Sequence, residues 1–443
     1  MADKAVSLRG EQTVLFTNRQ LVALMWPLLL EQFLAITVGL ADSLMVATVG
    51  DAAISAVSLV DSISNLMIYI FSAMATGGAA VAGQYIGQRQ KEDACHAGQQ
   101  LIALLDAVSV FFVALLYLFR TQILTVMFGH IEPDVMAATN TYYLYVMASI
   151  PGIALYNGGA ALWRTMGRSD ISLKVSLLMN GINVAGVAIP TLVSRTVAAA
   201  VILGMLFNDK LTLHLSNVRA FRLDMRLMKN IFYIGVPSGV ENGMFQLGRL
   251  VLFSLISTFG TASMVANAIG NTIANFNCFA GQAINLGLAA VVSQCVGAGE
   301  FDQARAYMKK IVKWTYGIMA VVNLTIIALL PLIMRVYNVS PEAEKLAVTV
   351  SLIHGISSIF LWIPAFTIPS FLRAAGDAQF TMLASMTTMW LVRVLLAYVL
   401  GRYLGYGVVG VWFAHAILDW LVRGSVFILR YRSGKWESMG IKT

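Results

Sequence analysis

The chain alternates long apolar stretches with short polar loops along almost its whole length. Most of these stretches hold about 20 residues or more, the length at which an α-helix crosses the hydrocarbon core of a bilayer. Only 12% of the 443 residues are charged, roughly half the share found in soluble domains, which argues against a large soluble helical protein. We expect twelve membrane spans, at residues 21–41, 52–81, 98–119, 141–162, 171–183, 184–207, 231–257, 263–292, 314–335, 348–371, 382–404 and 408–429.

Lysine and arginine are divided unequally between the two sides of these spans. With the loops assigned alternately from the N-terminus, 23 of the 30 basic residues fall on the side that holds both termini. Cytoplasmic loops carry such an excess, so we expect both termini in the cytoplasm. The net charge of +8 then belongs to loops on one side of a bilayer, and we expect no nucleic-acid partner. No small-residue cleavage site follows the first apolar stretch, so we expect a first span and not a signal peptide.

Motifs for catalysis are missing from the sequence. It contains no GxxxxGK[ST] phosphate loop, no HExxH and no GxSxG, so neither ATP hydrolysis nor membrane-embedded enzyme chemistry is favoured. The three cysteines show no metal-ligand spacing and form no even-numbered disulfide framework. We therefore expect no cofactor and no enzyme activity.

An internal repeat relates the two halves of the chain. Residues 27–94 match residues 237–304 without a gap at 17 positions, among them pairs that apolar composition does not produce. The clearest pairs are Pro27 with Pro237, Glu31 with Glu241, Asn65 with Asn275, and Gln84 with Gln294. Each half holds six expected spans, so both halves enter the membrane from the same side and form a parallel repeat. We expect an N-terminal lobe at 1–210, a cytoplasmic loop at 211–229 and a C-terminal lobe at 230–443.

Several short motifs resemble those of the multidrug and toxic compound extrusion (MATE) family. They are Pro27-Leu-Leu-Leu-Glu-Gln-Phe with Gly39-Leu-Ala-Asp42-Ser, the loops Gln84-Tyr-Ile-Gly87 and Gln294-Cys-Val-Gly297, and the elements Arg164-Thr-Met-Gly167 and Leu372-Arg-Ala-Ala-Gly-Asp377. The resemblance covers nearly the whole chain, and it rests on the order and repetition of these motifs.

This resemblance implies an all-α membrane protein with twelve transmembrane helices, in two six-helix lobes that form a V around a central cavity. It also implies a secondary antiporter that exports small organic, often cationic, compounds in exchange for H⁺ or Na⁺. We expect a monomer in the plasma membrane of a bacterium, the inner membrane. A flippase or exporter for lipid-linked or anionic cargo is the alternative within the same superfamily, and a cavity rich in Arg and Lys would favour it.

Acidic residues within the N-terminal spans are the first candidate site. Glu31 and Asp61 lie about 15 Å along their spans, near the middle of the bilayer, and Asn65 follows Asp61 by one turn. An ionisable group at that depth needs a partner or a function. For Glu31 the alternative is an acid paired with a neighbouring polar side chain. We expect these residues and Asn183 to carry cation coupling.

The resemblance adds Asp42 to this group, because an acid at the matching place belongs to the family's N-terminal cation site. Asp42 is thus our candidate Na⁺ ligand, and a solvated acid at a helix end is the alternative. We expect Asp42, Glu31 and Asp61 to line one polar pocket.

The C-terminal half is less acidic. Its candidate residues for substrate or polar contacts are Glu241, Asn242, Gln246, Asn275, His415 and Asp419. Asp419 and Arg393 both lie near the middle of their spans, and we expect them to form a buried ion pair. His415 precedes Asp419 by four residues and is either a proton relay or a partner in a structural hydrogen bond.

Span five is unusually short. The offset between the halves is 209 where Arg164 meets Arg373 but 224 where Gly186 meets Gly410, a difference of 15 residues. Either the span is truncated, or a segment is absent from the sequence; we favour the second, because a half-span ending in lipid leaves backbone groups unpaired. The resembled family has a cation-site acid in this span, and none occurs here between Asp170 and Asp209.

Overall fold

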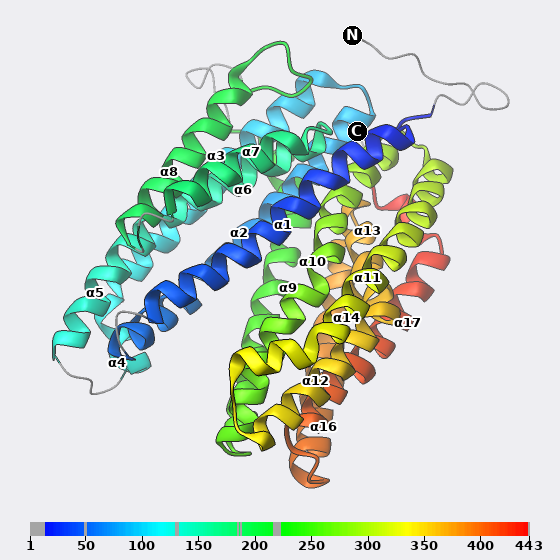
Figure 1. Ribbon diagram of the computed structural model, residues 1–443. Coiled ribbons are helices and arrows are strands. Elements are labelled where there is room, and N and C mark those ends of the chain that lie inside the picture. Colours follow the sequence, from blue (N-terminus) through cyan, green and yellow to red (C-terminus); the bar gives the residue numbers. More distant parts are fainter. Residues whose placement is uncertain are drawn as a thin grey trace. The chain divides into compact units, whose positions relative to one another are not determined.

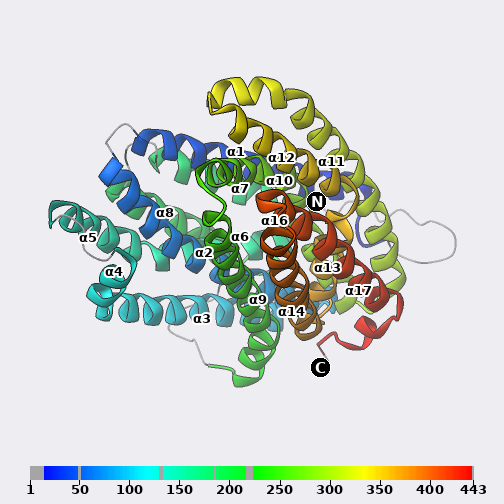
Figure 2. The same ribbon diagram turned by 90° about the horizontal axis from the view of Figure 1, so that it is seen from below.

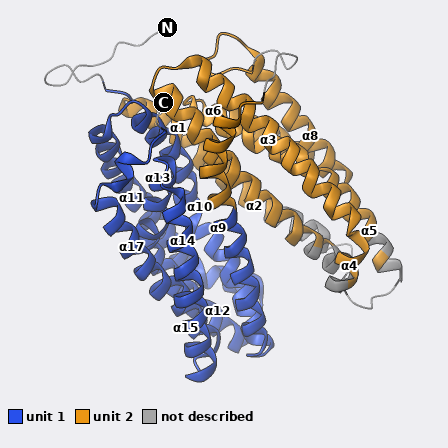
Figure 3. Cartoon of the chain, turned by 180° about the vertical axis from the view of Figure 1, so that it is seen from behind, with its two compact units in different colours: residues 1–15, 240–443 blue, residues 16–239 orange. Residues whose placement is uncertain are grey.

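The computed structural model describes residues 14–47, 51–128, 133–183, 186, 188–215 and 223–441. All regular secondary structure in these ranges is helical (Figures 1 and 2). The chain divides into two compact units, residues 16–239 (unit 2) and residues 1–15 with 240–443 (unit 1), coloured orange and blue in Figure 3. The expected all-α fold is confirmed. The boundary between the units falls inside a helix, and the expected lobe boundaries and the V arrangement stay predictions.

Unit 2 is built from the first eight helices and part of a ninth. They are α1 (Asn18–Ala47), α2 (Asp51–Gly87), α3 (Lys91–Leu118), α4 (Arg120–Phe128), α5 (Pro133–Ala148), α6 (Ile150–Thr165), α7 (Ser169–Asn183), α8 (Ile189–Gly204), the 3₁₀ turn η1 (Met205–Phe207) and the start of α9 (Met225–Ser257). Helix α2 packs against α3, α5 and α6, while α7 packs against α1 and α8.

Small residues allow α2 and α9 to approach closely inside unit 2. A Cβ atom on Gly77 would lie 2.9 Å from the Cα atom of Gly235. In a bilayer the hydrophobic effect contributes little between helices, so close packing of this kind supplies much of the association.

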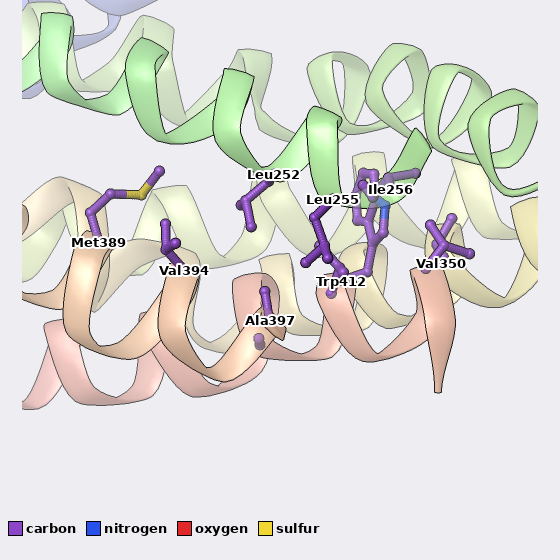
Figure 4. Packing of buried hydrophobic residues seen from close by; sticks show 11 residues of the cluster. Leu252, Leu255, Ile256, Val350, Met389, Val394, Ala397 and Trp412 are labelled. Carbon is purple, nitrogen blue, oxygen red and sulfur yellow. The ribbon is translucent and has the colours of Figure 1, made fainter. Parts of the chain in front are cut away.

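Unit 1 contains the rest of α9 and the helices that follow it. They are α10 (Thr261–Gly297), α11 (Phe301–Tyr337), α12 (Pro341–Phe360), η3 (Ile363–Thr367), α13 (Ile368–Ala374), α14 (Ala378–Thr387), η4 (Thr388–Val394), α15 (Leu395–Tyr398), η5 (Val399–Tyr403), α16 (Gly407–Phe413), η6 (Ala414–Asp419), α17 (Trp420–Arg432) and the 3₁₀ turn η7 (Lys435–Ser438). An apolar core joins α9, α12, η4, α15 and α16, with Leu252, Met389 and Trp412 among its members (Figure 4).

Each of the twelve expected spans corresponds to helical structure in the described residues. Nine helical stretches there are long and apolar enough to cross a membrane. The other three expected spans correspond to α5 with α6, to α7, and to α9. Helix α7 has only 15 residues, about 22 Å at 1.5 Å per residue. Residues 184, 185 and 187 lie outside the described residues, so the missing-segment hypothesis stays a prediction.

Spans ten to twelve are interrupted by π-helical segments. These are η3, η4, η5 and η6. A π-helical turn holds one more residue than an α-helical turn and changes the direction of the side chains after it, and such turns are frequent at functional sites. Arg393 lies in η4, and His415 and Asp419 lie in η6. Spans eleven and twelve therefore depart from regular helix where these residues occur, while η3 of span ten holds no charged residue.

Candidate functional site

Glu31 is held between three helices of unit 2. Its side chain projects from α1 and is only 7% exposed. One carboxylate oxygen, Oε2, accepts a hydrogen bond of 2.7 Å from the Ser172 hydroxyl of α7, and Oε1 accepts one of 3.2 Å from the Tyr156 hydroxyl of α6. All its partners are neutral hydroxyls, and no basic side chain of the described residues forms an ion pair with it. Glu31 therefore has the polar partners of the alternative, and its expected role in cation coupling stays a prediction.

Asp61 has a different environment in the same unit. Its Oδ1 accepts a hydrogen bond of 2.7 Å from the Tyr142 hydroxyl of α5. Arg195 of α8 lies close enough to attract the carboxylate, and its Nη1 donates to Ser149 Oγ at 2.8 Å and to Ser64 Oγ at 3.4 Å. Asp61 thus has a cation close by, whereas Glu31 forms no ion pair with the described residues.

The remaining N-terminal candidates are not joined to these acids by the described contacts. Asn65 is exposed, and Asn183 accepts a hydrogen bond of 2.9 Å from Thr191 Oγ1 of α8. Asp42 falls on α1, but its side chain lies outside the described residues. The hypothesis of one polar pocket formed by Asp42, Glu31 and Asp61 stays a prediction.

In unit 1, Glu241 pairs with the arginine of a repeated motif. The Nη1 atom of Arg373 lies 3.2 Å from one carboxylate oxygen and 3.1 Å from the other, and the Glu241 side chain is 8% exposed. This repeat partner of Glu31 is therefore neutralised by an arginine. Asn242 and Gln246 are half-buried and Asn275 is exposed.

The expected ion pair between Arg393 and Asp419 is wrong. Asp419, which is fully buried, pairs with Arg423 one turn further along span twelve, at 3.3 Å. The π-helical η6 ends at Asp419 and α17 then restores the i,i+4 spacing that brings Arg423 over it. Arg423 also donates to Thr388 Oγ1 at 3.2 Å and lies over the Phe245 ring, 4.4 Å from its centre.

Sequence reasoning missed His354, which lies at the centre of an aromatic cluster in unit 1. It is 2% exposed, and its Nδ1 lies 3.1 Å from Asn277 Nδ2 and 3.3 Å from Ser358 Oγ. Its ring centre is 5.1 Å from Trp420 and 5.8 Å from His415. The position of His354 inside an apolar stretch was the available signal. His415 makes ring contacts in this cluster, which leaves both of its proposed roles open.

The described residues contain no group of three or more His, Cys, Asp or Glu side chains that could hold a metal ion. The proposal that Asp42 ligates Na⁺ concerns a side chain outside those residues and stays untested.

The long apolar helices, with charged groups buried between them, define a polytopic membrane protein. The model of the MatE family matches the chain twice, at residues 27–209 and 237–399, and the chain belongs to this family. The resemblance seen in the motifs is thereby confirmed.

Relatives and a solved structure agree with this assignment. An uncharacterized transporter, YisQ, of Bacillus subtilis is 27% identical, over 95% of each chain. A probable multidrug resistance protein, NorM, of Thermotoga maritima is 22% identical, over 96% of this chain and 94% of its own. The fold matches a multidrug resistance MATE family transporter in an outward-facing conformation with a TM-score of 0.87 and 17% identity, covering 95% of this chain and 96% of that one.

Proposed function

We propose that this chain is a secondary antiporter that exports organic, chiefly cationic, compounds of varied structure in exchange for H⁺ or Na⁺ by alternating access. Glu31 is the observation that carries the proposal: it is a buried carboxylate whose partners are hydroxyls and which has no ion-pair partner among the described residues. An unpaired charge at membrane depth is costly, and a bound H⁺ or Na⁺ removes that cost. The multidrug resistance proteins among the relatives support organic compounds as cargo.

The hydroxyl partners suit a carboxyl group that changes charge. A hydroxyl donates to a carboxylate and can rotate to accept from a protonated carboxyl group. Gain or loss of the ion at Glu31 therefore changes the bonds that tie α1 to α6 and α7. We assign the coupling step to Glu31, which has no ion-pair partner among the described residues, whereas Arg195 lies close enough to Asp61 to attract its carboxylate.

The second candidate function is export of anionic or lipid-linked cargo. Arg393 favours it, because this buried cation of unit 1 has no carboxylate partner among the described residues.

We further propose a plasma-membrane location, the inner membrane of a bacterium, with both termini in the cytoplasm and the chain as a monomer. The excess of basic residues in alternate loops supports the orientation. All three native cysteines are buried, so a single cysteine added at either terminus is a clean reporter for a membrane-impermeant thiol reagent. Labelling in intact cells before lysis would contradict the orientation.

Transport into proteoliposomes tests the function. The full chain is reconstituted and uptake of a fluorescent organic cation is followed with a pH gradient and a Na⁺ gradient imposed separately. We expect accumulation against the cation's concentration gradient with one of the two ions, and none without either. Accumulation that depends on neither gradient would overturn antiport, and uptake restricted to anionic compounds would favour the second candidate.

A further inference from the structure

Arg393 is a buried cation that forms no ion pair with a carboxylate of the described residues. It lies in η4, is 5% exposed, and donates a hydrogen bond to the thioether of Met389, with Nη1 to Sδ at 3.4 Å. Thioether sulfur is a weak acceptor. Figure 4 shows Met389 and Val394, on either side of Arg393 in the sequence, packed beneath Leu252 of α9. The guanidinium therefore lies beside a closely packed apolar core.

The charges around Arg393 add up to a positive excess. Asp419 is the acid that attracts it, but Asp419 is already paired with Arg423. Arg423 and Arg249 both repel it, and Glu241 of the same unit is occupied by Arg373. A buried charge left in this state destabilises the unit by several kcal/mol. An anion that arrives from outside the chain would remove that cost.

Hydrogen-bond donors without acceptors accompany the charge. Arg393 Nε is buried and unpartnered in the described residues, as are the indole Nε1 atoms of Trp390, on the same π-helical segment, and Trp420. The ring of Trp420 packs against the ring of His354. Arg393 is close enough to His354 for its positive charge to act on that ring. Buried donors normally find an acceptor, so these three orphaned donors of unit 1, one of them on Arg393 itself, can all take an acceptor that comes from outside the chain.

We infer that unit 1 binds an oxyanion group of the transported compound, a carboxylate or a sulfonate, at Arg393. The guanidinium fork matches two oxygens of a planar or tetrahedral oxyanion. The rings of Trp420, His415 and His354 pack against one another in the same unit, and a flat apolar body bound at Arg393 would extend this aromatic cluster. This inference rests on the proposed export function for its ligand, and it makes Arg393 a residue that selects cargo by charge.

Matched ligands test the inference at equilibrium. A fluorescent aromatic carboxylic acid and its methyl ester differ in charge but share one scaffold, and their binding to the purified full-length protein is measured by anisotropy. We expect the wild-type protein to bind the acid about 10- to 100-fold more tightly than the ester, the range for a charge-assisted hydrogen-bonded pair. Arg393→Gln should remove this preference and leave ester binding unchanged, and Arg393→Lys should restore part of it.

Controls separate this site from general charge effects and from folding. Arg402→Gln makes the same change at an exposed position of the same span and should keep the wild-type preference. If Arg393→Gln binds the ester as the wild-type protein does, the variant is folded. If Arg393→Gln does not fold, the preference for the acid is measured in Arg393→Lys instead. An equal affinity for acid and ester in the wild-type protein, or an unchanged preference in Arg393→Gln, overturns the inference. A site that holds only a free inorganic anion would also show no preference for the acid.

Ion-coupled antiport and oxyanion binding at Arg393 can be refuted independently of each other. Binding of the acid needs no ion gradient, so the preference can persist in a protein that fails to perform antiport. Conversely, Glu31→Gln should abolish gradient-driven transport and retain the preference for the acid, because Glu31 lies in unit 2 and Arg393 lies in unit 1.

Discussion

Substitution of Asp419 by Asn tests the charge arrangement of unit 1. The carboxylate is fully buried and 3.3 Å from the Arg423 guanidinium, whose side chain is 2% exposed. Removal of one partner of such a pair costs about 3–5 kcal/mol, since the other charge is left buried. The ring contact of Arg423 with Phe245 persists in the variant, so we expect the lower end of that range.

The free energy of unfolding is measured in detergent micelles by denaturant titration. The matched control is Asp302→Asn: this acid pairs with Arg305 at 3.0 Å but is 88% exposed, and exposed pairs contribute only about 0–1 kcal/mol. Arg393→Met should leave stability unchanged or raise it, because it removes an unbalanced buried charge. A cost for Asp419→Asn no larger than the control's, or a double-mutant coupling of Asp419 with Arg393 that exceeds its coupling with Arg423, would refute the arrangement.

Three further changes have expected outcomes. Trp436→Ala should lower the free energy of unfolding by about 3–5 kcal/mol in the same titration, because this ring is fully buried among aromatic side chains; a loss below about 1 kcal/mol would contradict this packing. Arg195→Gln should impair folding or transport and be partly rescued by adding Asp61→Asn, as seen in expression level and uptake, and an additive double mutant would exclude the pair. Gly77→Val should reduce thermal stability, since Gly235 leaves no room for a side chain, and an unchanged melting curve would argue against that close approach.

The sequence contained enough information for the fold class and the span positions. The length of an apolar stretch reflects the thickness of a bilayer, so α10 and α11 could be placed from the apolar stretches in the sequence alone. The depths of Glu31, Asp61 and Asp419 along their helices followed from the rise per residue. These features depend on the local sequence and on the thickness of the bilayer.

The sequence did not allow us to predict which buried charged side chains pair with one another. Depth along a span says that Arg393 and Asp419 lie at similar levels, but it does not say how each helix is rotated about its axis. The π-helical segments η4 and η6 change that rotation, and nothing in the local residues marks where they occur. Arg423 was not identified from the sequence, although it is 1% exposed and pairs with Asp419.

The polar partners of Glu31 were also hidden. Tyr156 and Ser172 are ordinary residues of other spans, and they become a carboxylate-binding set only when α6 and α7 pack against α1. The sequence therefore identified the acid but not the hydroxyls that bind it.

The substitution Glu31→Gln tests most directly the claim that Glu31 couples transport to the ion gradient. Proteoliposomes that contain either the wild-type chain or Glu31→Gln are loaded with unlabelled cargo, and entry of labelled cargo is measured with no ion gradient and then with the coupling gradient. Exchange of cargo for cargo should persist in Glu31→Gln, because the amide keeps the size and a hydrogen-bonding oxygen of the side chain. The gradient should drive accumulation in the wild-type protein and none in the variant. Full gradient-driven accumulation by Glu31→Gln would contradict the account.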